Sequence, residues 1–457
     1  MKLALLGIIF VLGYTNLSYE LIILRQLINF LGSNILITSI VMAFILMFMS
    51  VGYYWGSVIP FKKNPIRKIN AKLLASLALW YAVSCQFDII SLFFVLLEGL
   101  KTPLIKTFLF SSIWLILPAI ATGFVTASIG RIVHHMNQNY TGRFMAIDTL
   151  GSVLGSLLTT LLFMPLIGVS ATVFSLVFLT AFTLLLSIHK KEKGWSLFVF
   201  VWIVFLSWTI NVYFPSKNSP YLIKDDAISR VEIVPGNEEN SKHMIINGSN
   251  SSKVAPYEEQ MFPYIQFVNL FLKKLPMDKK YQILVLGAAG FTAGIDDEWN
   301  EYTFLDIEPK IKEIAEKHFL EKPLGKNKRF IAQDAYFYML QNQKKYDIIF
   351  SDVYSSKQSI PMNFVTKDFF ELLKKSLNPN GYLFINIITS PTFENTFSKR
   401  VDNTLRAVFS QYLSRQIIRD FKLNSEELNN VIYIYHHLPK DDMIYTLDKN
   451  SAMYGQF

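Results

Sequence analysis

The sequence predicts a multi-pass α-helical membrane domain, then a small β-domain, then an α/β domain built on a parallel sheet. Three observations predict this order. Long apolar runs fill the first 214 of the 457 residues, short runs of alternating apolar residues follow, and buried strands that end in glycine or aspartate recur after residue 281. A chain of this length has room for all three parts. We expect them at residues 1–214, 215–272 and 273–457.

The membrane domain is predicted from the length of its apolar runs, each of which reaches the ~20 residues that cross a bilayer. The composition of the whole chain agrees, because 51% of its residues are hydrophobic, 17% are charged and the mean hydropathy is +0.31. We therefore predict about seven transmembrane helices, at residues 4–24, 36–60, 72–97, 103–126, 144–167, 169–188 and 195–214.

Glycine pairs four residues apart predict where these helices touch. Gly52 with Gly56, and Gly151 with Gly155, let two helix backbones approach each other closely. Close packing is the favoured interpretation of these pairs, and the lining of a channel is the alternative.

Three acidic residues lie within the apolar runs, where a charged side chain is costly and is usually paired or functional. Glu20 is followed by Arg25, and an ion pair between them fits the sequence as well as a transport role does. Asp148 stands near the start of its run beside Arg143, and capping or placement at the membrane interface is the favoured interpretation. Asp88 has no local partner, which makes it the candidate for substrate or proton contact in the membrane.

Two short segments after the apolar runs alternate polar with apolar residues, as the strands of a β-hairpin do. They are residues 228–234 and 243–248. We expect them to form the small β-domain that precedes the α/β domain.

Four apolar strands between residues 281 and 352 end in residues suited to binding a nucleoside. In an open parallel sheet with helices between the strands, ligands bind beyond the carboxyl ends of the strands. The four strand ends should therefore meet at one crevice that binds a nucleotide-like cofactor. The residues at these ends are Gly287 and Gly290, Asp306, Asp334 with Ala335, and Asp352.

The first two strand ends have the clearest physical roles. Gly287 and Gly290 let the backbone turn sharply and approach a ligand that a Cβ would exclude, although a plain strand-to-helix turn uses glycines as well. Asp306 follows this turn by about 20 residues, the spacing at which an acid accepts hydrogen bonds from ribose hydroxyls. A helix cap before Pro309 is the alternative.

The third strand end is suited to an adenine ring. Asp334 can accept a hydrogen bond from the exocyclic amine, and the small Ala335 leaves room for the edge of the base. A cap at the strand end is the alternative role of Asp334.

The ordered strand ends resemble the Rossmann fold of AdoMet-type methyltransferases, and more closely that of the polyamine aminopropyltransferases, the spermidine synthase family. The resemblance covers roughly residues 225–439. Its most specific piece is Asp-Ile-Ile-Phe-Ser-Asp-Val-Tyr at residues 347–354, followed by Ser-Ile-Pro at 359–361 and Thr-Lys-Asp-Phe-Phe at 366–370. The family also places a small β-domain ahead of this core, in agreement with the predicted hairpin.

The apolar half carries a second resemblance. Tyr19-Glu20, Arg25 and Gly32, together with residues 142–151, are similar to the membrane domain fused to many bacterial spermidine synthase-like proteins. The resemblance therefore implies a multi-pass protein of the bacterial inner membrane, with the lipid bilayer as a partner. It leaves open whether the protein is a homodimer.

The resemblance implies an aminopropyltransferase that uses decarboxylated AdoMet or AdoMet as alkyl donor and a small-molecule amine as acceptor. An amine must lose a proton to attack the carbon beside the sulfonium, and a carboxylate within hydrogen-bond reach both orients the ammonium and accepts that proton. Asp352 is the implied general base. Tyr354, at the start of a substrate-gating loop, is the second implied catalytic residue.

Several positions depart from the family pattern on the acceptor side. Ser355 stands where the family usually carries a second acid, and Ser251 stands where it has a glutamine. The implied acceptor-binding residues of this chain are Ser355, Glu259 and Tyr264. Because several carboxylates hold a diamine, the departures weaken the prediction of putrescine as acceptor.

Metal and nucleic-acid sites are not predicted. The histidines lack the spacing of metal ligands, and the one cysteine, Cys85, lies in an apolar run. No motif combines basic with aromatic residues as nucleic-acid-binding proteins do, so the net charge of +9 does not indicate a nucleic-acid partner.

Two other functions remain open, because a fold by itself does not determine activity. The first is an AdoMet-dependent methyltransferase or a sulfonium-cleaving enzyme. The second is a membrane transporter or sensor with a nucleotide-binding domain that does not react.

The sequence supports two opposed predictions for the side of the membrane on which the soluble domain lies. The basic loops, at residues 62–68, 131–143 and 190–193, all lie on one side if there are seven spans, and the positive-inside rule makes that side cytoplasmic. The carboxyl-terminal domain would then lie outside. AdoMet and its decarboxylated form are cytoplasmic metabolites, and on that ground we predict a cytoplasmic soluble domain.

Overall fold

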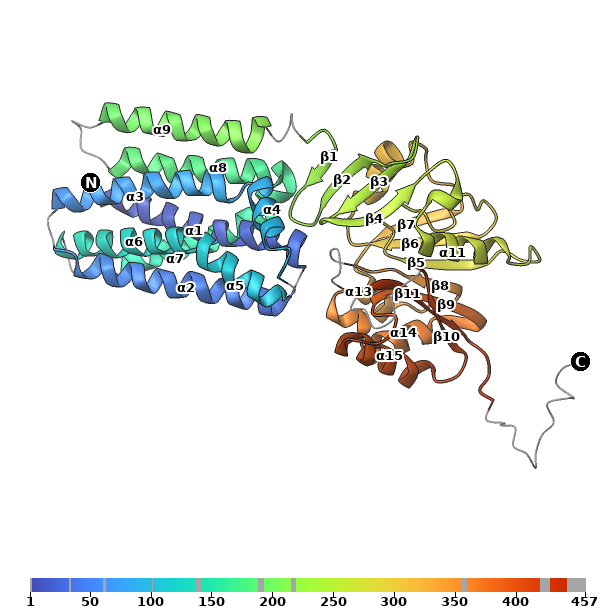
Figure 1. The fold of residues 1–457 in the computed structure, drawn as a ribbon. Helices are drawn as coiled ribbons and strands as arrows, with labels where there is room; N and C mark the ends of the chain where they lie inside the picture. Colours follow the sequence, from blue (N-terminus) through green and yellow to red (C-terminus); the bar gives the residue numbers. More distant parts are fainter. Residues whose placement is uncertain are drawn as a thin grey trace, which may run out of the picture. The chain divides into compact units, whose positions relative to one another are not determined.

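The computed structural model forms two compact units (Figure 1). It describes residues 2–32, 34–60, 63–100, 102–136, 141–187, 193–214, 219–354, 360–419 and 428–441. The first unit holds Met1–Asn237, Lys242–Ser251 and Tyr354–Ser359, and the second holds Glu238–Ser241, Ser252–Val353 and Ile360–Phe457.

The first unit is built mainly of long apolar helices that lie side by side (Figure 1). Two of them continue into single π-helical turns, at Thr159–Phe163 and Thr209–Tyr213. The helices are α1 (Lys2–Leu31), α2 (Ile35–Val58), α3 (Lys63–Ser84), α4 (Phe87–Leu96), α5 (Pro103–Trp114), α6 (Ile116–Met136), α7 (Thr141–Leu158), α8 (Met164–Ser187) and α9 (Lys193–Trp208).

Five helical stretches of the described residues are long and apolar enough to span a membrane, and six if the bent pair α3 and α4 counts as one span. Seven were predicted, and the difference arises where predicted runs are bent, divided or joined in the structure. The predicted run at 72–97 is bent by 72° between α3 and α4. The predicted run at 103–126 is divided at Leu115, so α5 is a short helix and α6 is the span.

The predicted runs at 144–167 and 169–188 are joined in one helical stretch of 47 residues, Thr141–Ser187. Gly168 interrupts this stretch with a non-helical backbone, at φ 80° and ψ 170°. A residue with a side chain rarely adopts that positive φ, so the glycine allows the chain to turn between α7 and α8.

The glycine pairs lie where helices touch. A Cβ at Gly52 of α2 would overlap the carbonyl oxygen of Ile120 in α6, and one at Gly151 of α7 would overlap that of Phe10 in α1. The pairs therefore let two backbones pack with no side chain between them, as predicted.

A four-stranded antiparallel sheet follows the helices. Its strands are β1 (Leu222–Asp225), β2 (Arg230–Pro235), β3 (Lys242–Ile246) and β4 (Ser249–Val254), in the order β1-β2-β3-β4. Asn247 and Gly248 connect β3 to β4 with positive φ angles of 48° and 75°, which suit a tight hairpin turn. The predicted hairpin is thus present, extended by two further strands.

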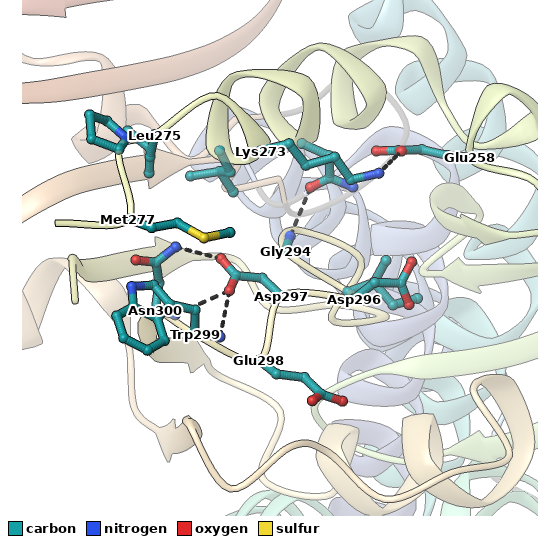
Figure 2. Close-up of a pocket in the computed structure, with 14 residues that line it drawn as sticks. Glu258, Lys273, Leu275, Met277, Gly294, Asp296, Asp297, Glu298, Trp299 and Asn300 are labelled. Atoms are coloured by element: carbon teal, nitrogen blue, oxygen red, sulfur yellow. Dashed lines mark hydrogen bonds and ion pairs between the residues drawn. The ribbon is translucent and has the colours of Figure 1, made fainter. Parts of the chain in front are cut away.

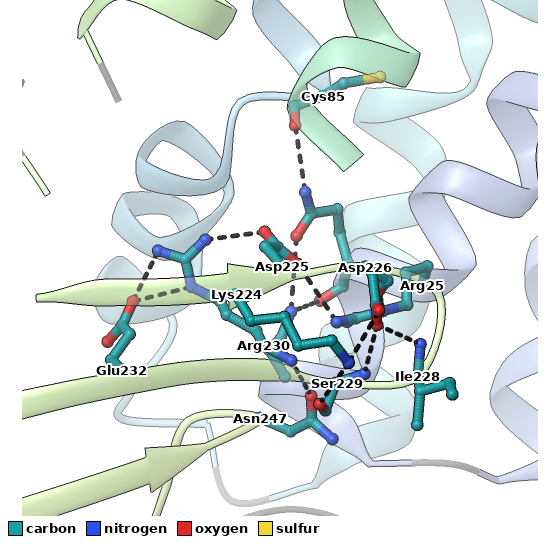
Figure 3. A network of polar contacts seen from close by, with 12 residues as sticks. Arg25, Cys85, Lys224, Asp225, Asp226, Ile228, Ser229, Arg230, Glu232 and Asn247 are labelled. Atoms are coloured by element: carbon teal, nitrogen blue, oxygen red, sulfur yellow. Dashed lines mark hydrogen bonds and ion pairs between the residues drawn. The ribbon is translucent and has the colours of Figure 1, made fainter. Parts of the chain in front are cut away.

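A buried polar network joins this sheet to α1 within the first unit (Figure 3). One guanidinium nitrogen of Arg25 lies 3.2 Å from Asp225, and its Nε donates to the carbonyl of Asp226 at 2.6 Å. Arg230 binds the other oxygen of Asp225 at 2.9 Å and also pairs with Glu232. Arg25 therefore pairs with β1, not with Glu20, and the pairing of Glu20 with Arg25 considered above is not what the structure shows.

The second unit is an α/β domain with a seven-stranded sheet. Neighbouring strands are parallel from β9 through β7, and β10 and β11 add an antiparallel edge that the sequence analysis did not foresee. In sheet order the strands are β10 (Leu413–Ile417), β11 (Asn429–His436), β9 (Leu377–Thr389), β8 (Tyr346–Ser351), β5 (Gln282–Leu286), β6 (Glu301–Asp306) and β7 (Lys328–Ala332).

Helices and nearly continuous apolar strands form the core of this domain. The strands β5, β8 and β9 are buried along most of their length, as expected for strands covered on both faces. The helices are α11 (Pro263–Lys273), α12 (Ile311–Ile314), α13 (Ala335–Gln341), α14 (Lys367–Lys375) and α15 (Thr396–Phe409).

The contact between α1 and α7 can be tested with a matched pair of substitutions. We expect Gly151→Ala to lower the free energy of unfolding by about 1–3 kcal/mol, because the added Cβ has no room and one helix must shift. Gly142→Ala, at the start of the same helix, is the control, since no atom lies within 4 Å of the Cβ it would add. Thermal unfolding in detergent compares them, and equal midpoints would contradict the close contact.

Candidate functional site

The carboxyl ends of four neighbouring parallel strands carry the predicted site residues. The order β8-β5-β6-β7 places the end of β5 between those of β8 and β6. Asp352 follows β8, Gly287 follows β5, Asp306 ends β6 and Asp334 comes after β7. The structure therefore brings these four positions to one edge of the sheet, where open α/β sheets bind ligands.

The glycine turn is held by backbone contacts. Gly287 has a φ of 88°, and a Cβ there would overlap the carbonyl oxygen of Asp352. The N–H groups of Gly287 and Ala288 both donate to the carbonyl of Leu305, at 2.9 and 3.0 Å. Only glycine fits the first position, so the turn lies directly beside the loop that begins with Asp352.

Gly290 has a different reason to be glycine. A Cβ on Gly290 would overlap the ring of Phe319, and its N–H donates to the Ser252 hydroxyl at 3.0 Å. Packing explains this residue, and its role in binding a cofactor stays a prediction.

Asp306 binds the backbone of its own loop and of the glycine turn. One carboxylate oxygen accepts from the Ala289 N–H at 3.1 Å, and the other accepts from the Glu308 N–H at 3.0 Å. Burial raises the pKa of Asp306, and these backbone hydrogen bonds oppose that effect. The carboxylate thus fixes the geometry of two loops, a structural role beside the predicted one of binding ribose.

Asp334 caps the helix that follows it. Its Oδ1 accepts from the N–H groups of Tyr336 and Phe337, at 2.9 and 3.1 Å, at the start of α13. This is an N-cap, close to the capping role that the sequence analysis kept as the alternative. Ala335 is buried, and contact of either residue with adenine stays a prediction.

Asp352 differs from the other two acids because side chains hold it. The amide of Asn386 donates to its Oδ1 at 2.9 Å, and the Tyr264 hydroxyl also forms a hydrogen bond with it. Burial raises the pKa of Asp352 to about 6, and both hydrogen bonds oppose the rise. Among the described residues, no lysine or arginine is paired with this carboxylate. A carboxyl group of this kind can take up and release a proton near neutral pH.

Asn386 is the site residue that the sequence analysis missed. It lies in β9, and its amide reaches Asp352 across a separation of 34 residues. The one available signal was an amide within the apolar run Leu383-Phe384-Ile385-Asn386-Ile387. A buried polar residue in such a strand needs a hydrogen-bond partner, and a polar residue at the end of a neighbouring strand can supply one.

The predicted acceptor residues are not all gathered at this site. Tyr264, in α11, is buried and bonded to Asp352. Glu259 is exposed on a short 3₁₀ turn, where its backbone carbonyl accepts from Gln266. Tyr354 belongs to the first compact unit, and Ser355 lies outside the described residues. The roles of Glu259, Tyr354 and Ser355 therefore stay predictions.

A pocket of about 290 Å³ lies elsewhere in the second unit (Figure 2). Its walls come from the end of α11, from residues 275–277 and from the loop Gly294–Asn300, which lead into β5 and β6. It therefore lies towards the amino ends of these strands. Asp297 in its wall binds Asn300 and Tyr302, and Lys273 pairs with Glu258. The pocket is not the predicted crevice.

The described residues contain no group of three or more His, Cys, Asp or Glu side chains that could hold a metal ion.

Comparisons with known proteins match parts of this chain. The family model of the spermine/spermidine synthase domain matches residues 278–422. Polyamine aminopropyltransferase 2 of Aquifex aeolicus is 22% identical over 395 residues, which is 82% of this chain and 76% of that protein.

Solved structures give weaker likenesses. A probable spermidine synthase from Corynebacterium glutamicum aligns with 17% identity over 50% of this chain and 82% of its own, with a TM-score of 0.39. Human methyltransferase-like protein 13 in complex with SAH aligns with 19% identity over 42% of this chain and 86% of its own, with a TM-score of 0.31.

The raised pKa of Asp352 predicts an unusual dependence of stability on pH. Because the folded pKa is about 6 and the unfolded value is about 3.9, the folded state binds the proton more tightly. The carboxyl group therefore stabilises the fold most below about pH 4, and that contribution is lost as the pH rises to about 6. Asp352→Asn stays neutral, so we expect its unfolding midpoint to rise relative to the wild type between pH 4.5 and 7.5. A pH-independent difference in midpoint would contradict the raised pKa.

Proposed function

We propose that this chain, which carries a distantly related spermine/spermidine synthase domain at residues 278–422, transfers an alkyl group from an adenosyl sulfonium to an amine. Decarboxylated AdoMet is the donor that the family assignment favours, and AdoMet is the other. The observation that carries the proposal is the carboxyl group of Asp352, whose pKa burial raises to about 6 beside the glycine turn.

The proposed reaction needs one base. The ammonium of the acceptor binds near Asp352 and gives it a proton, and the freed lone pair attacks the carbon next to the sulfonium sulfur. The C–N bond forms as the C–S bond breaks, and the neutral thioether leaves with the bonding electrons. With decarboxylated AdoMet the thioether is methylthioadenosine. Tyr264 and Asn386 orient the carboxylate through their hydrogen bonds.

The donor side of the proposed site is the row of strand ends from β5 to β7. Gly287 gives the close backbone approach, Asp306 faces the ribose, and Asp334 with Ala335 takes the adenine, while Gly290 supports the turn. Tyr354, Ser355 and Glu259 are proposed on the acceptor side. Ser355 carries no charge, so an acceptor with a single ammonium near Asp352 suits the site better than a diamine such as putrescine.

Methyl transfer from AdoMet is the second candidate function, favoured by the serine at position 355 in place of an acid. A transporter or sensor that binds the nucleoside without reaction is the third. In each case the proposed location is a bacterial inner membrane, supported by the apolar helices of the first half, and a homodimer is the proposed assembly. The supply of donor from the cytoplasm is the one argument for a cytoplasmic site.

Products distinguish these functions. The purified full chain is incubated with decarboxylated AdoMet or AdoMet and a panel of amines, and the products are identified by mass spectrometry. We expect methylthioadenosine and an aminopropylated amine. S-Adenosylhomocysteine would instead establish methylation. Methylthioadenosine without an alkylated amine would establish cleavage of the sulfonium. Tight binding of the donor without turnover would favour the transporter or sensor.

The general base is tested with Asp352→Asn. This change keeps the size of the side chain and an oxygen that accepts from Asn386, but removes basicity. We expect the turnover number to fall by about 10²- to 10⁴-fold while donor affinity changes little. Asn386→Ala is the companion variant. It removes a hydrogen bond that lowers the pKa of Asp352, so the acid limb of the pH–rate profile should move to higher pH. Full activity of Asp352→Asn would exclude it as the base.

The donor site is tested with Asp306→Ala. Loss of charged hydrogen bonds to ribose should weaken binding by about 1.5–3 kcal/mol, measured by calorimetric titration with the donor. Because Asp306 also binds the backbone of two loops, Asp306→Asn serves as control, since it keeps one oxygen as an acceptor. Unchanged donor affinity in a folded Asp306→Ala protein would show that Asp306 does not bind the donor.

A further inference from the structure

We infer that the helical bundle crosses the membrane seven times and holds the β1–β4 sheet on the side opposite the basic loops, which is the side away from the cytoplasm. Contacts within the first unit and the charges of the sequence support this orientation, and the proposed reaction has no part in it.

The direction of α7 and α8 follows from their contacts with α1. Gly151 of α7 faces Phe10 of α1, and further along both helices Thr159 donates to the Ser18 hydroxyl at 2.8 Å. The two helices therefore run parallel. At the other end, Gly7 near the start of α1 faces Leu186 near the end of α8, so α8 runs back to where α1 begins.

The 47-residue stretch Thr141–Ser187 must for this reason cross twice. A straight helix of that length would measure about 70 Å, against about 30 Å of hydrocarbon in a bilayer. The turn comes at Gly168, and a Cβ on this residue would lie 3.1 Å from the carbonyl oxygen of Asp225 in β1. The turn between α7 and α8 is thus at the end of the bundle that carries the sheet.

The helices α2 and α6 run in the opposite sense to α1. Gly248, in the turn between β3 and β4, packs on the backbone of Asn29 near the end of α1, so α1 ends at the sheet and α2 starts there. Along α2 and α6, Gly52 faces Ile120 and the carbonyl of Ile59 accepts from Arg131 at 2.6 Å. These two helices therefore run parallel to each other and away from the sheet.

The helices α3 and α9 both end at the sheet. The ring of Phe87, three residues after α3, lies 3.7 Å beneath the guanidinium of Arg230 in β2. Near the end of α9, Asn211 donates to the carbonyl of Ala82 in α3 at 2.9 Å, and Gln86 donates to that of Ile210 at 3.0 Å. The long helices therefore alternate in direction, and the N-terminus and the sheet lie at opposite ends of them (Figure 1).

Basic residues are concentrated at the end of the bundle that holds the N-terminus. The described residues at or near the helix ends there include Lys2, Lys63, Arg67, Lys68, Arg131, Arg143 and Lys193. Of the described residues in the corresponding parts of the sheet end, Lys106 is basic, besides Arg25. Short loops rich in Lys and Arg remain cytoplasmic, and acidic residues contribute little to the rule.

Arg25 does not weaken this asymmetry, although it lies at the sheet end of α1. It is buried, and Asp225 neutralises it through an ion pair of 3.2 Å (Figure 3). Of the two opposed predictions from the sequence, the bundle contacts therefore favour the one from loop charge, an external soluble domain, over the one from donor supply. Described residues after Tyr213 include no further candidate span, so we assign the described residues beyond it to the same side as the sheet. A donor made in the cytoplasm would then reach it through an export step.

Labelling of introduced cysteines tests the orientation. Lys367→Cys places a thiol on α14, where the lysine side chain is 63% exposed, and Gly142→Cys places one at the basic end. Spheroplasts that express each full-length variant are treated with a membrane-impermeant maleimide before and after permeabilisation. The wild type, with Cys85 buried, gives the background.

We expect Lys367→Cys to react in intact spheroplasts and Gly142→Cys to react only after permeabilisation. The reverse pattern would overturn the orientation, and equal labelling of both without permeabilisation would overturn the seven crossings. A fusion after Phe457 gives an independent readout, in which alkaline phosphatase should be active and green fluorescent protein dark. Neither measurement depends on turnover. A result that contradicts the orientation is therefore distinguishable from a result that contradicts the proposed function.

Discussion

Close contact between backbones, made through glycine, is the constraint on which both units depend. In the bundle, Gly52 and Gly151 bring α2 against α6 and α7 against α1 at a distance that leaves no room for a Cβ. In the α/β domain, Gly287 packs in the same way against the carbonyl of Asp352. Backbone atoms adapt less than side chains do, so these contacts fix the spacing of the helices and the position of the proposed base.

The ion pair between Arg25 and Asp225 fixes the sheet to the bundle in a different manner. Charges as buried as these have lost their hydration, which their mutual attraction and the bond from Arg25 to the Asp226 carbonyl must offset. Removing one partner of such a pair typically costs about 3–5 kcal/mol, because the other charge remains buried. The ion pair therefore stabilises only an arrangement of α1 and β1 in which the two charges meet.

The three aspartates at the strand ends differ in their hydrogen-bond partners, and this difference gives them different chemical properties. Backbone N–H groups bind Asp306 and Asp334, and the carboxylates in turn stabilise a turn and a helix. Asp352 instead has two neutral side chains as donors, Asn386 and Tyr264, which hold it in place while burial raises its pKa to about 6. That difference, rather than position along the edge, makes Asp352 suited to moving a proton.

The sequence by itself determined the apolar helices, the parallel strands and the residues at the strand ends, because run length and alternation are local properties. Only the tertiary structure decided which groups meet. Arg25 takes its partner from β1, 200 residues away, and Asn386 reaches Asp352 from a strand later in the chain. It also decided where Gly168 turns the chain, and hence which ends of the helices carry the basic loops. Such pairings follow from the packing of helices and the order of strands, and a local sequence pattern does not contain that information.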